Sequence, residues 1–276
     1  MLKERNRMSG ETVPNSNVKT RALMFGCGNM GQALISGWKK AADVSFTVVD
    51  PAEPQIADVD VHKSLDTVEG AYDLIIVAVK PQMIADVMSN ATETVGSAGL
   101  VLSIAAGTSM QTLQSIMGER AIVRMMPNMP ASVKLGLLGL YANDVCTAED
   151  KALIETLSSE NGSFIWLDDE DKMDRFTAIA GSGPGYVFEI MRLFAKSAMT
   201  LGFSEEEARM LSVGTFYGAA GMADENGGSL EDMRNAVTSK KGVTLAGLEQ
   251  LMADDVLGGL LNSTVDAAYK RAVELR

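Results

Sequence analysis

The strongest indication of the fold of this chain is the stretch Ala22-Leu23-Met24-Phe25-Gly26-Cys27-Gly28-Asn29-Met30-Gly31. Its first four residues are apolar, as in a strand buried inside a sheet, and residues 32–40 have the composition of a helix. The glycines between them follow the spacing G-x-G-x-x-G. A strand, this loop and a helix in that order are typical of the βαβ unit that binds a dinucleotide. We therefore predict an N-terminal Rossmann-type domain.

The three glycines of the loop have distinct predicted roles. Gly26 permits a tight turn, Gly28 lets a pyrophosphate approach the backbone, and Gly31 lets the next helix pack closely on the strand. That helix points its N-terminus, where backbone N–H groups are free, at the anion.

Asp50 is the candidate residue for recognition of the adenosine ribose. It ends the next predicted strand, Phe46–Val49, at close to the spacing from Gly26 that such a residue has. A carboxylate there accepts hydrogen bonds from the ribose hydroxyls and repels a 2′-phosphate, so we predict NADH in preference to NADPH. The alternative is that Asp50-Pro51 is only a turn that ends the strand.

Short apolar strands alternate with helical stretches from residue 21 to residue 167, a pattern typical of a parallel sheet wrapped by crossover helices. The strands are expected at Ala22–Phe25, Phe46–Val49, Leu74–Val79, Leu100–Ile104, Ile122–Met125, Leu137–Tyr141 and Phe164–Leu167. From Asp168 onward, helical apolar spacing replaces the strand-like runs. We predict an α/β fold: a doubly wound dinucleotide-binding domain, residues 21–167, is followed by an all-α domain, residues 168–276, for substrate binding and dimerisation. Residues 1–20 are expected to be a disordered tail.

The last predicted helix carries an apolar stripe at three-to-four residue spacing. Its members are Val256, Leu257, Leu260, Leu261, Val265, Ala268, Tyr269, Ala272 and Val273. Such a stripe has to be covered, either by the core of the domain or by a second copy of the chain. Both interpretations stay open, and the second predicts a homodimer or a larger homo-oligomer formed through the C-terminal helices.

Composition excludes several classes of partner. The net charge is −12 and no stripe of Lys and Arg is visible, so we expect no nucleic acid partner. The longest apolar runs, such as Leu135–Leu140, are far shorter than the roughly 20 residues that a membrane span needs. Residues 1–19 lack the apolar segment of a secretory signal. Since the only two cysteines, Cys27 and Cys146, are not expected to pair, we predict a soluble cytoplasmic protein.

Histidine, the side chain most often used for acid–base and metal chemistry at neutral pH, is almost absent from this chain. The chain has one histidine, His62, which we expect to be solvated at the end of a short strand and to have no catalytic role. This excludes a mechanism built on a histidine base or on several histidine metal ligands. The acidic run Asp168–Asp171 is interpreted as the solvated start of a helix, and no metal is predicted.

Other strand ends should line the same crevice as the glycine loop, because open parallel sheets bind ligands beyond the carboxyl ends of their strands. Three such ends combine small residues or proline with a polar group: Ala78–Pro81, Ser103–Gly107 and Met126–Asn128. We expect Asn128 to hold the nicotinamide carboxamide. The residues predicted to bind the cofactor, NADH or NADPH, are Gly26, Cys27, Gly28, Asn29, Met30, Gly31, Asp50, Ser64, Ala78, Val79, Lys80, Pro81, Ala105 and Asn128.

These segments, together with two in the second half, resemble the pyrroline-5-carboxylate reductase family across nearly the whole chain after the tail. The two further segments are Thr177–Tyr186, similar to the family's Gly-Ser-Gly-Pro-Ala-Tyr region, and Val237–Thr244, similar to its substrate loop. The resemblance implies reduction of the C=N bond of 1-pyrroline-5-carboxylate to L-proline by hydride from NAD(P)H. A protonated C=N bond is already electrophilic, so this reaction needs little acid–base equipment.

The resemblance also implies a substrate site. Its residues are Ser182, Ser239, Gly242, Val243 and Thr244. Backbone N–H groups of Gly242, Val243 and Thr244 are expected to bind the substrate carboxylate at a helix start, and the Thr244 hydroxyl is the predicted catalytic group, in contact with the ring nitrogen or an ordered water. The alternative is that Thr244 only caps its helix and that residues 181–184 only separate two helices, with Pro184 at a helix start.

Two departures from the family touch this site. The family has Pro-Gly where this chain has Lys240-Lys241, and Ala where it has Gly185. The first puts two cations near a carboxylate pocket and leaves the exact imino acid open.

Two rival functions stay open. One is a reductase of another small imino or keto acid, such as the β-hydroxyacid dehydrogenases, although Lys172 and Lys196, the candidate catalytic lysines, lack a glycine-flanked motif. The other is a dinucleotide-binding regulator without turnover.

Overall fold

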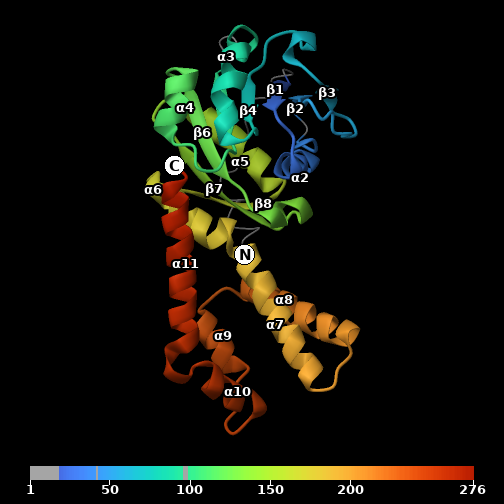
Figure 1. The fold of residues 1–276 in the computed structure, drawn as a ribbon, viewed down its shortest axis with the longest axis vertical. Helices are drawn as coiled ribbons and strands as arrows, with labels where there is room; N and C mark the ends of the chain where they lie inside the picture. The colour runs from blue at the N-terminus through green and yellow to red at the C-terminus, as the bar shows by residue number, and fades with distance from the viewer. Residues whose placement is uncertain (1–18, 42, 96–98) are drawn as a thin grey trace. The chain divides into compact units, whose positions relative to one another are not determined.

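The computed structural model describes residues 19–41, 43–95 and 99–276 (Figure 1). The predicted disordered tail lies outside the described residues, apart from Lys19 and Thr20. The chain forms two compact units. The first, the sheet unit, extends to Ser182 and also includes Tyr269–Arg276, and the second, the helical unit, is Gly183–Ala268.

One sheet organises the sheet unit, with the strand order β3-β2-β1-β4-β5-β6-β7-β8. The strands are β1 (Thr20–Phe25), β2 (Val44–Val49), β3 (Asp60–His62), β4 (Leu74–Val77), β5 (Leu100–Ser103), β6 (Ala121–Met126), β7 (Gly136–Ala142) and β8 (Gly162–Trp166). All the predicted strands are present, and β3 is an additional short strand. The order reverses beside β1, at the point where a doubly wound sheet binds its ligand.

The pairing departs from a purely parallel sheet at one place. Strand β7 runs antiparallel to β6, whereas β7 and β8 are parallel to each other. The connection from β6 to β7 holds only the short 3₁₀ turn η3 (Met129–Val133). A parallel crossover needs a dozen or more residues, so this connection is too short to form one.

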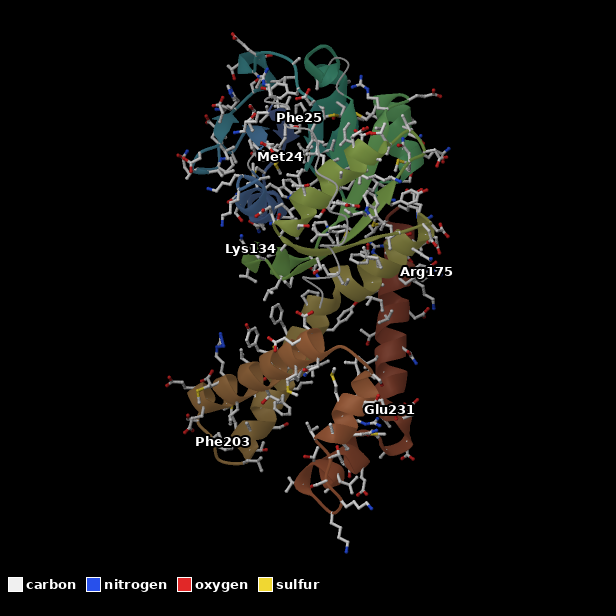
Figure 2. The ribbon with its side chains drawn as sticks, turned by 180° about the vertical axis from the view of Figure 1, so that it is seen from behind. Met24, Phe25, Lys134, Arg175, Phe203 and Glu231 are labelled. Atoms are coloured by element: carbon white, nitrogen blue, oxygen red, sulfur yellow. The ribbon has the colours of Figure 1, made fainter. Side chains whose placement is uncertain are left out.

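Helices cover both faces of the sheet (Figure 1). Helices α2 (Asn29–Trp38) and α5 (Ala148–Ser159) pack on one face, and α3 (Ile84–Val95) and α4 (Met110–Met117) pack on the other. Met24 and Phe25, labelled in Figure 2, are neighbours on β1 that enter the two different cores, as alternation along a strand requires. The predicted doubly wound α/β fold is confirmed.

The sheet unit continues past the predicted boundary at Leu167. Helix α6 (Asp171–Phe176) and the π-helical turn η4 (Thr177–Gly181) follow β8, and Met173 and Ala178 are buried. A Cβ on Gly139 would lie 2.8 Å from the Phe176 ring, so α6 packs directly on β7. Sequence spacing assigned α6 to the second domain because it is helical, but its apolar side chains belong to the core of the first.

The helical unit is all α, as predicted. Its elements are α7 (Gly183–Thr200), α8 (Glu205–Asn226), α9 (Leu230–Ala236), α10 (Val243–Leu251), the 3₁₀ turn η5 (Ala253–Asp255) and most of α11 (Val256–Glu274). Among the described residues of this unit, only Ala208 and Ser212 are buried. Large apolar side chains stay exposed, among them Phe188 at 64% and Tyr217 at 71%. A single copy of the chain therefore leaves much of the apolar surface of these helices uncovered.

Candidate active site

The glycine loop adopts the conformation that its sequence predicts. Gly26 has φ +82, and a Cβ there would lie 2.8 Å from Val79 Cγ1, so both the turn and the close approach of β4 exclude a side chain. A Cβ on Gly31 would lie 2.7 Å from the Met24 side chain, which agrees with close packing of α2 on β1. Nothing lies within 4 Å of the corresponding position on Gly28. The space in front of Gly28 is open to a phosphate.

Helix α2 begins directly at this open space. Gly28 is its N-cap residue and contributes no capping side chain, so the first N–H groups of α2 have no side-chain acceptor at the cap. Such groups and the helix dipole favour an anion. The loop and helix together fit the pyrophosphate of a dinucleotide.

Asp50 holds the glycine loop in place. Its Oδ2 accepts a hydrogen bond from the Cys27 N–H at 2.6 Å, and its Oδ1 accepts one from the Ala52 N–H at 2.8 Å. Burial, together with the charge of Asp50, raises the pKa of the Cys27 thiol to about 11. Each carboxylate oxygen retains a second lone pair. Asp50 is thus a structural clamp on the loop, which leaves it able to accept a ribose hydroxyl as well.

A first cavity, of about 910 Å³, opens over the carboxyl ends of β1, β2 and β4. The residues that line it are Phe25, Gly26, Cys27, Gly28, Val49, Asp50, Pro51, Ala52, Lys63, Ser64, Leu65, Asp66, Ala78, Val79, Lys80, Met83 and Val87. Gly26, Asp50, Ser64 and Lys80, predicted from the sequence, meet here. Lys63 was not predicted and brings a cation to the same cavity as Asp50.

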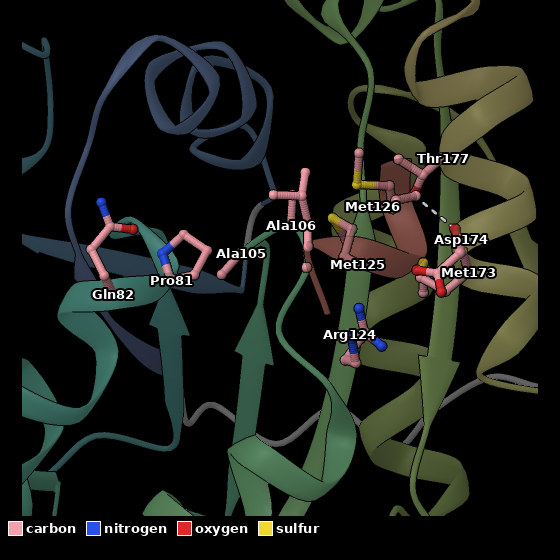
Figure 3. Close-up of a pocket in the computed structure, with 13 residues that line it drawn as sticks. Pro81, Gln82, Ala105, Ala106, Arg124, Met125, Met126, Met173, Asp174 and Thr177 are labelled. Carbon is pink, nitrogen blue, oxygen red and sulfur yellow. Dashed lines mark hydrogen bonds between the residues drawn. The ribbon is translucent and has the colours of Figure 1, made fainter. Parts of the chain in front are cut away.

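A second cavity, of about 460 Å³, lies over the carboxyl ends of β4, β5 and β6 (Figure 3). The residues that line it are Pro81, Gln82, Ala105, Ala106, Gly107, Arg124, Met125, Met126, Met173, Asp174, Thr177, Ala272 and Leu275. Lys80 lines the first cavity and Pro81 the second, so the two cavities follow one another along the sheet edge. An extended dinucleotide needs a site of this form.

Asn128, which we predicted at the nicotinamide, is absent from the linings of both cavities. It is only 7% exposed. Its Oδ1 accepts from the Leu137 N–H at 3.0 Å, and its Nδ2 donates to the Ala180 carbonyl at 3.0 Å. Both ends of the amide join β6 to neighbouring segments, and this geometry argues for a structural role instead of cofactor binding.

A buried ion pair beside the second cavity was missed from the sequence. Arg124, which lines the cavity, is 5% exposed and pairs with Glu170. The same Glu170 oxygen accepts from the Met110 N–H at the start of α4. Glu170 is therefore not part of a solvated helix start. No local sequence signal indicates this arrangement, because Met110, Arg124 and Glu170 lie far apart along the chain.

The other polar groups singled out from the sequence have structural partners. Asp168 pairs with Lys172 at 2.5 Å, so this lysine is engaged at the surface. His62 ends β3 and contacts Thr67 Oγ1 at 2.8 Å and Asp60 Oδ2 at 3.0 Å. With a side chain only 20% exposed, His62 is partly buried and not solvated as predicted. Within the described ranges, no group of three or more His, Cys, Asp or Glu side chains is placed to hold a metal ion.

The predicted substrate segment forms a tight turn before α10. The Gly242 N–H donates to the Ser239 carbonyl at 3.0 Å, and Lys241, third in the turn, has φ +61. A turn with positive φ at its third position favours Pro at the second residue and Gly at the third, which is the Pro-Gly of the family. Lys240-Lys241 therefore occupies a backbone shape that suits Pro-Gly better.

Helix α10 begins one residue earlier than predicted. Gly242 is its N-cap and Thr244 is its second residue, so the alternative that Thr244 caps the helix is wrong. The Gly242 N–H is used in the turn, and the free amides are those of Val243, Thr244 and Leu245. Val243 is 94% exposed, and the described residues supply no partner for the Thr244 hydroxyl.

Ser182 ends the π-helical turn, with its N–H bonded to the Thr177 carbonyl at 2.8 Å. Pro184 is the second residue of α7, so residues 181–184 do separate two helices. Ser182 belongs to the sheet unit, whereas the 239–244 segment belongs to the helical unit.

No helix in the described part of the chain has the length and apolar character to cross a bilayer.

A glycine loop clamped by a carboxylate, open to an anion and continued by cavities along the strand ends, defines a dinucleotide-dependent oxidoreductase. Residues 22–107 accordingly match the family model described as NADP oxidoreductase, coenzyme F420-dependent. Residues 170–275 match the model described as pyrroline-5-carboxylate reductase dimerisation. The chain belongs to the pyrroline-5-carboxylate reductase family.

Relatives match the chain along nearly its full length. It is 34% identical over 266 residues to the pyrroline-5-carboxylate reductase of Pseudomonas aeruginosa, covering 92% of this chain and 96% of that one. It is 36% identical over 255 residues to that of Haemophilus influenzae, covering 89% and 92%.

Solved structures agree with this assignment. The pyrroline-5-carboxylate reductase of Coxiella burnetii superposes with a TM-score of 0.83 at 29% identity, covering 93% of this chain and 98% of that one. The pyrroline carboxylate reductase of Plasmodium falciparum, solved with NADP bound, gives a TM-score of 0.81 at 25% identity, covering 94% and 98%.

Proposed function

We propose that this chain reduces the C=N bond of 1-pyrroline-5-carboxylate to give L-proline, with a nicotinamide dinucleotide held along the carboxyl edge of the sheet. The observation that carries the proposal is the open space at Gly28, before an α2 N-terminus without a capping side chain, in a chain whose relatives are reductases along nearly their full length. When bound, the dinucleotide supplies a hydride from C4 of its nicotinamide ring.

The first cavity suits the adenosine half of the cofactor, because Asp50 and Ser64 line it at the ends of β2 and β3. The second suits the nicotinamide half, because small side chains such as Ala105 and Ala106 admit a flat ring. We propose NADH over NADPH, since a 2′-phosphate beside Asp50 meets a carboxylate. Lys63 lines the same cavity and partly offsets that repulsion.

The substrate carboxylate binds, in this proposal, at the N-terminus of α10. The amides of Val243, Thr244 and Leu245 are the donors, and Lys240 and Lys241 add positive charge beside them. The Thr244 hydroxyl contacts the ring nitrogen or a water that delivers its proton. Since the protonated ring is already electrophilic, these residues mainly bind and orient it.

The proposed assembly is a homodimer or larger homo-oligomer that covers the apolar faces of the helical unit. The exposed side chains of α7, α8 and α11 and the match to a dimerisation model support it. We also propose that the protein acts in the cytoplasm, where the free thiols of Cys27 and Cys146 stay reduced.

The test is NADH absorbance with 1-pyrroline-5-carboxylate, for the native chain and for Thr244→Val. The variant should lose up to about tenfold in kcat/KM, because one neutral hydrogen bond in the transition state contributes roughly 0.5–1.5 kcal/mol. Thr156→Val is the matched control, because Thr156 is exposed on α5 and, among the described residues, its hydroxyl donates to the Ala152 carbonyl alone. If the chain binds NADH but does not oxidise it, a dinucleotide-binding regulator is favoured. If NADH is oxidised only in the presence of keto acids, a reductase of another small acid is favoured.

A further inference from the structure

One wall of the second cavity comes from the segment 272–276, far along the chain from the strands that form its base. Ala272 and Leu275 line the cavity together with the strand ends and α6. A Cβ on Gly107, which has φ +73, would lie 2.5 Å from the Leu275 carbonyl oxygen. The segment therefore lies directly against the β5–α4 loop, and Gly107 has room for no side chain.

Arg276 fastens this segment to α6. Its Nε donates to Asp174 Oδ2 at 2.8 Å, its Nη2 contacts the same oxygen, and Nη2 also reaches Asp171 Oδ1 at 3.3 Å. Asp174 is 4% exposed and itself lines the cavity. A carboxylate buried to this extent needs a cationic partner, and Arg276 supplies it. The Tyr269 hydroxyl donates to Asp171 at 3.1 Å and fixes the preceding turn of α11.

We infer that Arg276 is a positioning residue for the nicotinamide half of the cofactor. By pairing with Asp174 it holds Ala272 and Leu275 in place as an apolar wall, against which the nicotinamide ring and its ribose pack. This inference rests on the proposed function, because it assigns the second cavity to the nicotinamide. The first cavity has no lining residue from 272–276 in the described part of the chain, so the adenosine half does not depend on Arg276.

The test compares the binding of a whole cofactor with that of its adenosine half, in the full-length protein and without substrate. Isothermal titration gives Kd for NADH and for ADP-ribose with Arg276→Gln. We expect Kd for NADH to rise about tenfold and Kd for ADP-ribose to stay within about twofold. Arg276→Lys, which keeps the charge, should fall between. The matched control is Arg271→Gln, because Arg271 lies on α11, ahead of the 272–276 segment, and its one ion-pair partner among the described residues is the exposed Glu274.

A second variant guards against loss of folding in Arg276→Gln. Leu275→Ala trims the wall, leaves the Arg276–Asp174 pair intact and changes a side chain that is 57% exposed. Leu275→Ala should likewise raise Kd for NADH and leave Kd for ADP-ribose nearly unchanged. The inference is wrong if Kd rises equally for NADH and ADP-ribose, or if Kd for NADH is unchanged in both variants. Since no turnover is measured, failure of the proposed reaction is detected separately by the substrate assay.

Discussion

Replacement of Asp50 by serine tests the two roles of this carboxylate together. Serine is too short to reach both the Cys27 and the Ala52 amides, which Asp50 now accepts at 2.6 and 2.8 Å. Hydrogen bonds to a charged group contribute roughly 1.5–3 kcal/mol, and the Cys27 bond is the more buried of the two. We expect Asp50→Ser to lose roughly 1.5–3 kcal/mol of unfolding free energy, or roughly 3–12 °C in Tm.

The same change should shift the cofactor preference. A 2′-phosphate about 5 Å from a carboxylate is repelled by roughly 1–3 kcal/mol at the effective dielectric constant of a partly exposed site, which is about 5- to 150-fold in binding. The ratio of kcat/KM for NADH to that for NADPH should fall by a factor in this range. Because the Lys63 cation in the same cavity attracts a 2′-phosphate, we expect the change in this ratio to lie toward the lower end of the range.

Asp50→Asn separates the two roles. Its carbonyl oxygen still accepts one of the two amides, so the loss of stability should be smaller than with serine, whereas the lost charge should shift the cofactor ratio equally. The assay is kcat/KM with each cofactor beside a thermal melt for all three proteins. If the ratio stays constant while Tm falls, Asp50 only clamps the loop. If NADPH is clearly better in the native protein, the proposed preference is wrong.

Three further predictions concern other residues. Lys241→Gly should raise the free energy of unfolding, measured by urea denaturation, by about 0.5–1 kcal/mol, because it removes a side chain from a positive-φ position. The same change removes a cation and should raise KM for the anionic substrate. A lower free energy of unfolding would show that the turn is not strained by Lys241. The Cys27 thiol, with its pKa raised from 9.0 to about 11, should resist alkylation in the native protein at pH 8. Rapid labelling of Cys27 in the folded protein would contradict this. The thiol ionises at lower pH in the unfolded chain than in the folded one, so the free energy of unfolding should fall as the pH rises from 9.0 to about 11. Asn128→Ala should cost about 2–4 kcal/mol by leaving the Leu137 N–H and Ala180 carbonyl unpaired, with Kd for NADH unchanged; a selective loss of NADH affinity would restore Asn128 to the cofactor site.

The parts of the site that were predictable are those that local backbone chemistry determines. Gly26 and Gly31 are readable from the sequence, because a tight turn and a close helix–strand contact exclude side chains at fixed spacing. The strands were readable because β4 and β5 are buried on both faces and therefore continuously apolar.

The sequence-based interpretation departs from the structure where a polar side chain has a partner far away along the chain. Asn128 looked like a ligand because it follows a strand end, but Ala180, far along the chain, takes its amide. Glu170 looked solvated because it stands in an acidic run, but Arg124 and the start of α4 bury it. Arg276 gave no local signal, since its role depends on Asp174 in α6. Periodicity and spacing contain no information on such pairings.

The reduction of the C=N bond by this protein can be followed with a deuterium label on the cofactor. The protein is incubated with 1-pyrroline-5-carboxylate and NADH that carries deuterium at both hydrogen positions of nicotinamide C4, and the product is analysed by mass spectrometry and NMR. Hydride transfer to the C=N carbon predicts L-proline with one deuterium at ring carbon 5. Proline without deuterium, or oxidised cofactor without proline, would rule out hydride transfer from the nicotinamide to this substrate.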